Sequence, residues 1–295
     1  MENRGTFAGV NSLKFNQIFR TSEDCAEYIA KIKWEQGYHC KRCGNEKFIK
    51  GAKPFYRRCL KCKYDESPTA GTMFDKVKFS LLLAFHIVFK VVTKKKGMST
   101  LELSREFELR QKTCWNFKWK IQQAMASSLR NLLQGMVHVD EFFVGGPQEQ
   151  KRGRSKGEKK LVVVALEVIE NGVGRAYAEV IEHASSKELG LFLNKYVSKD
   201  AKIIADEWTG YIPLKKEFSK LEQVASDNGK NFNDLHLHIM NLKGWLRGIH
   251  HHCSKEHIQG YLNEYHYRYN RRNYMGSMFD LLIKRMVLNS PVRLL

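Results

Sequence analysis

The chain has 295 residues, of which 43% are hydrophobic and only 5 are prolines, which excludes a collagen-like or wholly disordered protein. Its 50 Lys and Arg against 31 Asp and Glu leave a net charge of +19, and residues 1–135 hold +14 of that excess. This concentration of positive charge predicts a polyanionic partner that is bound mainly by the N-terminal half. A basic surface kept only for solubility is the less favoured interpretation.

The N-terminal residues lack the apolar run of a secretory signal, and the longest apolar stretch, 79–92, is too short to span a bilayer. Four of the seven cysteines occur in CxxC pairs, which favours metal ligation in a reducing compartment over disulfides. We therefore expect a cytoplasmic protein without a membrane segment.

Two CxxC pairs separated by 15 residues lie in the segment 1–66. Four thiolates at this spacing can surround one zinc ion tetrahedrally, which predicts a zinc ribbon whose folding depends on the metal. Basic and aromatic residues alternate around the pairs, and they favour a surface that contacts phosphate over a zinc clip that only joins two proteins. The predicted zinc ligands are Cys40, Cys43, Cys59 and Cys62, and the predicted phosphate contacts are Arg57 and Arg58.

The segment 67–134 has the apolar spacing of helices. Apolar residues repeat along one helical face over 81–92, and Gly97 with Ser99 or Thr100 marks the break before the next helix. A short helix over 101–107, a tight connection over 108–110 and a helix from 111 to about 133 have the outline of a helix-turn-helix DNA-binding motif. Lys112 and Lys118 on its second helix are the predicted DNA contacts, and a plain helical hairpin is nearly as well supported.

From residue 136 onward the pattern changes to an α/β domain. Three strands in a meander are followed by a helix, a strand, a short helix, a further strand and a long helical tail. This order is that of a ribonuclease-H-like domain. We therefore predict three parts: a zinc ribbon (1–66), a helical DNA-binding segment (67–134) and a ribonuclease-H-like catalytic domain (135–295).

Two aspartates belong to neighbouring strands of that domain. Asp140 lies within or at the end of the first strand and Asp206 closes the fourth, and in this strand order the first and fourth strands lie side by side. Close carboxylates repel each other unless a cation lies between them, so the pair predicts a site for Mg²⁺ and metal-dependent phosphoryl transfer. Either aspartate by itself is more often the cap of a turn.

A third metal ligand is expected from the last helical segment. Asn241 is the candidate, because its amide oxygen can coordinate a metal, although it adds no charge. The competing residues are His236, Asp227, Asp234 and Glu222.

The chain resembles insertion-sequence transposases of the zinc-ribbon, ISXO-like group, whose catalytic domain belongs to the DDE recombinase superfamily. The resemblance lies in the paired CxxC motifs, in HVDEFFVGG, in ADEWTGY and in the tail NLKGWLRGIHHHCSKEHIQGYLNEYHYRYNRR. Together these segments cover the ribbon and most of 136–295, and the tail is the most specific of them.

The resemblance implies that Asp140 and Asp206 are catalytic acids and that Asn241 stands where relatives carry Glu or Asn. Lys243 is implied to lie near them and to touch phosphate. Two Mg²⁺ ions, replaceable by Mn²⁺, would serve catalysis in addition to the structural zinc. One departure is Glu207, where the family motif usually has Gly, and it puts the activity of this copy in question.

The implied activity is that of a DNA transposase. Such a protein binds the terminal inverted repeats of its element and catalyses metal-dependent strand cleavage and strand transfer into target DNA, as a dimer or larger assembly on chromosomal DNA. A zinc-ribbon transcription regulator, a ribonuclease-H-type nuclease and an inactive transposase are the alternatives. Further predicted backbone contacts are Lys151, Arg152, Arg154, Arg271 and Arg272.

Overall fold

The computed structural model describes residues 7–145, 159–250 and 253–291. The chain divides into two units, one made of Met1–Met125 with Asn273–Leu295 and the other of Ala126–Arg272. Within the described ranges, no helix combines the length and the apolar character needed to cross a membrane. The predicted loop contacts Lys151, Arg152 and Arg154 lie outside the described residues.

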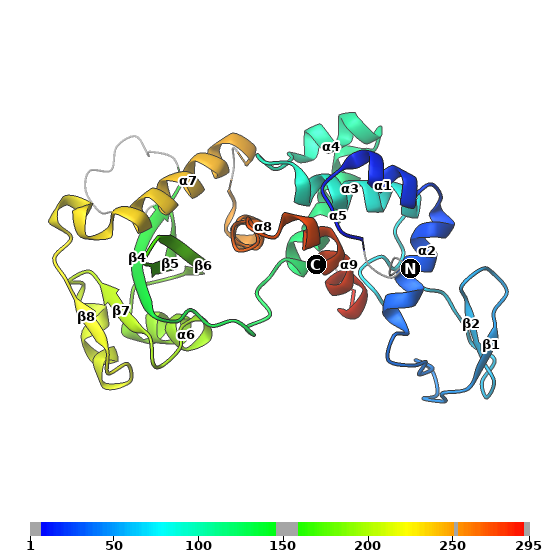
Figure 1. Ribbon diagram of the computed structural model, residues 1–295, viewed down its shortest axis with the longest axis horizontal. Helices are drawn as coiled ribbons and strands as arrows, with labels where there is room; N and C mark the ends of the chain where they lie inside the picture. The colour runs from blue at the N-terminus through cyan, green and yellow to red at the C-terminus, as the bar shows by residue number, and fades with distance from the viewer. Residues whose placement is uncertain (1–6, 146–158, 251–252, 292–295) are drawn as a thin grey trace. The chain divides into compact units, whose positions relative to one another are not determined.

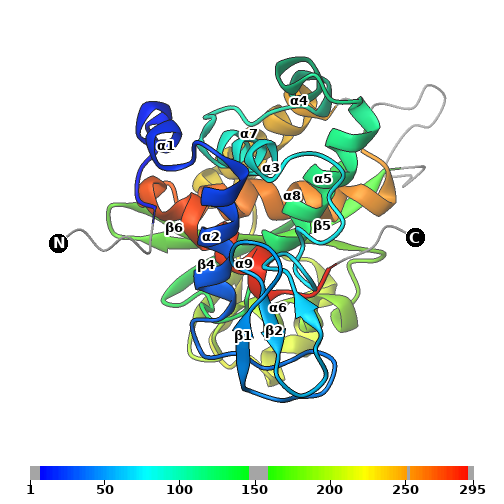
Figure 2. The ribbon, with the colours of Figure 1, turned by 90° about the vertical axis from the view of Figure 1, so that its right-hand side faces the viewer.

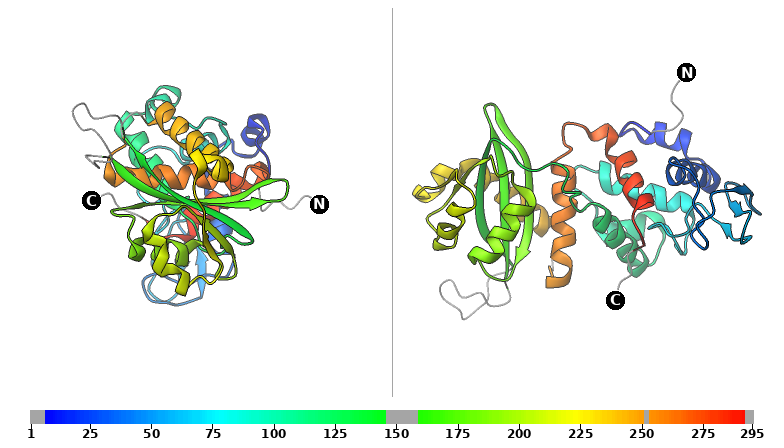
Figure 3. Two further views of the ribbon diagram at one scale, coloured as in Figure 1. Left: turned by 90° about the vertical axis from the view of Figure 1, so that its left-hand side faces the viewer. Right: turned by 90° about the horizontal axis from the view of Figure 1, so that it is seen from below.

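The second unit contains a mixed sheet with helices on both faces, an α/β architecture (Figures 1 and 3). Its strands are β4 (Met136–Val144), β5 (Lys160–Ile169), β6 (Gly172–Ile181), β7 (Lys202–Ala205) and β8 (Leu221–Gln223). Its helices are α6 (Ser186–Tyr196), α7 (Asn233–Ile249) and α8 (Lys255–Tyr269), with short 3₁₀ segments η1 (Thr209–Lys216) and η2 (Asp227–Phe232).

The strand order is β6-β5-β4-β7-β8. The meander β4-β5-β6 is antiparallel, as the turn signals predict, whereas β7 pairs in parallel with β4 and β8 pairs in parallel with β7. The predicted neighbourhood of the first and fourth strands is therefore confirmed. The predicted succession of helices and strands over 136–232 is observed as well.

Alternation along β4 separates its side chains between two cores. Val137 and Val139 belong to the core under α6 and η1, whereas Phe142 and Val144 belong to the core under α7 and α8. Asp140 shares the even-numbered face and so lies on the α7 side of the sheet. The neighbouring strand β5 is buried on both faces over its central residues, which explains its continuous apolar run LVVVAL.

Side chains from α8 and the residues after it cover the outer edge of β6. Asn270 pairs with Ala176, accepting from its N–H at 2.9 Å and donating to its carbonyl at 2.8 Å. Arg272 donates to the carbonyl oxygens of Gly174 (3.1 Å) and Val173. These bonds satisfy backbone groups that an exposed edge strand would otherwise offer to another chain.

The first unit combines a small three-stranded ribbon, which carries the four paired cysteines, with a helical core. The ribbon strands are β1 (Phe48–Lys50), β2 (Arg57–Cys59) and β3 (Asp65–Glu66), which are antiparallel and lie near α2 (Figure 2). The helices are α1 (Ser12–Ile18), α2 (Ser22–Lys33), α3 (Leu81–Thr93), α4 (Thr100–Phe107), α5 (Gln111–Ala124) and α9 (Met278–Leu288), and a short 3₁₀ segment η3 (Met275–Ser277) precedes α9.

Aromatic residues from distant parts of the sequence form the core of the first unit. Phe15 stacks on Phe89 with ring centroids 4.3 Å apart, and both rings contact Phe279 of α9. The hydroxyl of Tyr28 donates to the carboxylate of Asp280. The C-terminal helix α9 is therefore part of the same core as α2 and α3.

The units divide the chain differently from the predicted domains. The predicted boundary between residues 66 and 67 falls inside the first unit, and the one between residues 134 and 135 falls inside the second. Helix α9, predicted within 135–295, packs with the first unit. Helices α1 and α2 also occupy the start of the segment that was predicted as ribbon alone, with a Thr21–Asp24 capping box beginning α2. Helix α5 ends at Ala124, short of the predicted end near 133.

Candidate active site and metal centre

Asp140 is a partly buried carboxylate in β4, and its side chain is 22% exposed. Its Oδ1 accepts from the backbone N–H of Glu141 at 2.7 Å. Its Oδ2 lies 3.2 Å from Nε2 of His236, at the start of α7. The acid is therefore held between its own strand and the helix that covers it.

Asp206 follows β7 directly and lies beside Asp140. The parallel register pairs Val139 with Ala205, so the next residue on each strand is one of the two aspartates. The Oδ1 of Asp206 accepts from the backbone N–H of Trp208 at 3.0 Å, and its carbonyl accepts from the Gln223 side chain at 3.1 Å. The predicted convergence of the two aspartates at one edge of the sheet thus has a structural basis.

The pKa values of Asp140 and Glu141 are both raised at this edge of the sheet. Burial raises the pKa of Asp140, and the charge of Asp206 raises it further, whereas the N–H of Glu141 and the nearby His236 lower it. Burial also raises the pKa of Glu141 to about 7, and the buried Tyr211 donates a hydrogen bond to it. Because Glu141 points to the opposite face of β4 from Asp140, it lies behind the site.

Helix α7 brings His236 and Lys243, not Asn241, to Asp140. Among the described residues, His236 and Lys243 line the cleft beside Asp140 and Asn241 does not. Five residues along an α-helix correspond to a rotation of about 140°, so Asn241 lies on a different face from His236. The structure thus places His236, one of the competing residues, next to Asp140, and a role for Asn241 as the third ligand stays a prediction.

Lys243 lines the same cleft as Asp140. Its Nζ is 5.1 Å from the ring centroid of Phe142, on the same strand face as Asp140. Burial lowers the pKa of Lys243, and the charge of Asp140 acts in the opposite direction. The site thus combines partly buried carboxylates with a nearby cation, an arrangement suited to holding a phosphodiester.

Glu207, the departure from the family motif, is exposed at the bend that follows β7. The groups that shift the pKa of Asp140 most are Glu141, Asp206 and His236, and Glu207 is not among them. The extra carboxylate of Glu207 is therefore exposed to solvent next to Asp206 and has little electrostatic influence on Asp140.

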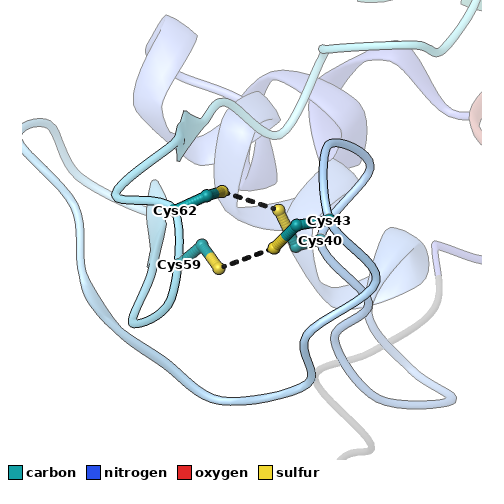
Figure 4. A group of neighbouring side chains, drawn as sticks. All are labelled: Cys40, Cys43, Cys59 and Cys62. Carbon is teal, nitrogen blue, oxygen red and sulfur yellow. Dashed lines mark hydrogen bonds between the residues drawn. The ribbon is translucent and has the colours of Figure 1, made fainter.

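The four paired cysteines converge in the ribbon (Figure 4). Their sulfur atoms all lie within 4.8 Å of one another, with Cys40 Sγ 3.6 Å from Cys62 Sγ and Cys43 Sγ 3.5 Å from Cys59 Sγ. Tetrahedral zinc with bonds of about 2.3 Å needs sulfur atoms about 3.8 Å apart, so the cluster fits this ion. Although burial acts to raise the pKa of Cys59, N–H donors from Cys62 and Lys61 lower it to about 6.

Two of the predicted DNA contacts have partners inside the protein. Lys118 is only 1% exposed, and its Nζ donates to the carbonyl of Met98 at 2.6 Å. The guanidinium of Arg272 covers the edge of β6 and stacks on Tyr269. Charge along a sequence does not reveal such contacts, and a DNA-contacting role for either residue stays a prediction.

The other basic residues differ in how far they are engaged. Arg57 stacks on the rings of Trp34 and Phe48, and Arg58 pairs with Asp65 at 3.2 Å. The Arg271 side chain donates to the carbonyl of Tyr267 and lies over its ring. Lys112, in the first turn of α5, is exposed.

Two groups near the acidic edge were not predicted. The Glu141–Tyr211 pair supports Asp140 from behind, and its sequence signal is the carboxylate next to Asp140 together with the Tyr of ADEWTGY. Arg247 lines the same cleft as Lys243. The spacing of four residues between Lys243 and Arg247 on a predicted helix would have placed them on one face.

The chain is similar to known proteins from mobile elements. Residues 132–270 match the model of the ISXO2-like transposase domain. A Halobacterium salinarum protein described as an uncharacterized protein in transposable element ISH50 is 25% identical over 280 residues, covering 85% of this chain and 92% of its own length.

Solved structures of Mos1 transposase are more distant. A pre-cleavage Mos1 transpososome shares 12% identity with a TM-score of 0.33, and the Mos1 strand transfer complex shares 13% identity with a TM-score of 0.31. Each similarity covers 68% of this chain and 78% of the other. TM-scores this low do not establish a shared fold.

Proposed function

We propose that the protein is a DNA transposase, because residues 132–270 match the ISXO2-like transposase domain. It binds the terminal inverted repeats of its insertion sequence and catalyses metal-dependent strand cleavage and transfer into target DNA. The observation that carries the proposal is the pair Asp140 and Asp206 on adjacent parallel strands, with His236 against the first of them. The strand order of the sheet supports a ribonuclease-H-like class.

The donor set at this edge suits a hard divalent cation. Asp140 and Asp206 offer carboxylate oxygens, the ligands that Mg²⁺ and Mn²⁺ prefer. Burial and, after it, the charge of Asp206 raise the pKa of Asp140, and a cation would relieve the repulsion between the two carboxylates. When bound, such ions activate the attacking hydroxyl and stabilise the leaving 3′ oxygen.

The chain's own residues hold and orient the DNA strand. His236 fixes the Oδ2 side of Asp140 and so sets the direction of its free lone pairs. Lys243 offers its ammonium group to the phosphate next to the cut. A transposase of this type needs no protein nucleophile, because the freed 3′-hydroxyl of the element attacks the target strand directly.

The first unit supplies the modules for reading the element's ends. The ribbon exposes Lys47, Lys50 and Lys53 next to Phe48 and Ile49, a surface suited to phosphate contact. The turn between α4 and α5 supports a helix-turn-helix, because Glu108 caps the end of α4 in a left-handed conformation (φ 51°) and α5 begins three residues later. Because two ends must be joined, the active species on DNA is a dimer or a larger assembly.

Replacing two lysines of α5 with alanine is expected to change the stability of the protein by different amounts. Lys118→Ala leaves the Met98 carbonyl without its buried donor, and the unfolding free energy should fall by about 2–3 kcal/mol. Lys112→Ala changes an exposed side chain, so stability should stay within about 0.5 kcal/mol of wild type. Urea unfolding of both variants measures this difference.

The Lys112→Ala variant also tests whether α5 contacts DNA. Lys112→Ala should weaken binding to the element's ends and reduce the slope of log affinity against log salt by about 0.9, the contribution of one phosphate contact. A salt slope identical to wild type would contradict a phosphate contact at Lys112.

Substitution on two faces of α7 tests the composition of the site. His236→Ala is expected to slow cleavage of labelled end DNA in Mg²⁺ by about 10²-fold, since Asp140 loses the group that orients it. Asn241→Ala should stay within about threefold of wild type, because Asn241 is exposed and does not line the cleft beside Asp140. Gel analysis of cleaved strands gives both rates. The reverse ranking would assign the third ligand to Asn241 and leave His236 without a role in cleavage.

A further inference from the structure

An apolar cleft adjoins the acidic site along α7. It has a volume of about 390 Å³, and Asp140 and His236 lie in its wall. The rest of the wall is largely apolar and is built by Phe142 of β4 with Ile239 and Met240 of α7. Phe142 and Ile239 are largely buried, whereas Met240 is 57% exposed. A large exposed methionine next to catalytic carboxylates has no role in the core of this unit.

Two cations complete the cleft beyond its apolar part. Lys243 and Arg247 lie one helical turn apart on the face of α7 that carries His236 and Met240. From His236 to Arg247 the helix rises about 16 Å, enough for a few nucleotides of an extended strand. Along the helix the cleft therefore offers an acidic group, then an apolar surface, then positive charge.

We propose that this cleft binds an unstacked nucleobase of the strand that is cut, from the nucleotide next to the scissile phosphate. The inference rests on the proposed function and deepens it by naming what the site accepts beside the phosphodiester. The base lies against Phe142, Ile239 and Met240, and the phosphates that follow it are held by Lys243 and Arg247.

The chemistry of the wall selects this occupant. A phosphate backbone alone gains nothing from Phe142, Ile239 and Met240, and an apolar protein segment gains nothing from two adjacent cations. A nucleotide has both parts, an apolar base face and an anionic phosphate. Taking a base out of the stack costs a few kcal/mol, and contact with aromatic and apolar side chains offsets that cost.

Single abasic nucleotides test the inference through binding alone. Duplexes that carry the element's end receive one abasic nucleotide, moved position by position through the cleavage site, and affinities are measured with zinc-loaded full-length protein without Mg²⁺. Met240→Ala is the test variant. Leu237→Ala is the control, because Leu237 is 48% exposed on the same helix but lies outside the wall of the cleft.

On intact end DNA, Met240→Ala is expected to bind about 5- to 10-fold more weakly than wild type, a loss typical of one stacked base. At one abasic position this deficit should disappear, since no base remains to be contacted. Leu237→Ala should stay within about twofold of wild type on every duplex. Thermal unfolding of both variants should match wild type, because both side chains are exposed.

Two results would overturn the inference. A Met240→Ala deficit that persists at every abasic position would mean that Met240 contacts the backbone or a second copy of the chain. The absence of any deficit would mean that no base enters the cleft. If wild type neither binds nor cleaves the intact end DNA, the proposed function itself fails, whereas cleavage by wild type with either of those results leaves that function standing.

Discussion

Asp206→Asn is expected to lower the rate of strand cleavage by about 10³-fold, which corresponds to about 4 kcal/mol of transition-state stabilisation. Asparagine preserves the shape of the side chain and an oxygen that accepts from the Trp208 N–H, so the turn after β7 should keep its conformation. What it removes is the negative charge beside Asp140. Rates of 3′-end nicking under single-turnover conditions measure the effect, and affinity for the end DNA should stay within about threefold of wild type.

Asp200→Asn is the matched control for this substitution. Asp200 is an exposed aspartate of the same unit, in the turn before β7, and its loss should leave the cleavage rate unchanged. If the Asp206→Asn protein cleaved at the wild-type rate while the Asp140→Asn protein was inactive, Asp206 would not be the second catalytic acid. The second acid would then lie elsewhere, with Glu207 as the first residue to examine.

Cys59→Ser is expected to cost the protein its zinc and most of its affinity for the element's ends. Cys59 is fully buried, and the small core around the cluster includes Trp34 and Tyr38. A core of this size does not hold a ribbon together without metal, whose binding contributes about 10–16 kcal/mol in zinc-finger peptides. Metal analysis should find no zinc, and limited proteolysis should cut between the two CxxC pairs.

Cys114→Ala provides the control for zinc loss. Cys114 is as buried as Cys59 but lies in α5, away from the cluster, so this variant should keep one zinc per chain. The second unit should remain folded in both variants, because its cores contain none of the four ligands. A Cys59→Ser protein that retains zinc and binds end DNA as wild type does would contradict a structural role for the cluster.

Local pattern predicted the strands around the acidic edge, and the succession of strands and helices, which is that of a ribonuclease-H-like domain, predicted which strands are neighbours. The alternation in MVHVDEFFV, the apolar run LVVVAL and the turn at Asn171–Gly172 predict the meander, and parallel pairing of β4 with β7 brings Asp140 and Asp206 together. The cysteine spacing likewise predicted the cluster in the ribbon. In each case the residues whose pattern makes the prediction are close in sequence or lie on adjacent strands.

What the sequence could not predict depends on side-chain direction and long-range packing. His236 and Asn241 lie on one helix, and only the docking of α7 on β4 decides which of them meets Asp140. Lys118 and Arg272 carry charge like the neighbouring basic residues, but tertiary contacts bury or engage them. The packing of α9 with α2 and α3 brings together residues up to 252 positions apart, such as Tyr28 and Asp280. A local sequence pattern cannot predict such a contact.

A strand-transfer assay tests the proposed transposase activity. Wild-type protein is incubated with Mg²⁺, labelled DNA carrying the ends of its own insertion sequence, and an unlabelled target plasmid. We expect the label to become covalently attached to the plasmid through the 3′ end of the element, and Asp206→Asn to give no such product. Specific binding of the ends with neither nicking nor joining, in Mg²⁺ and in Mn²⁺, would show that the protein is not an active transposase.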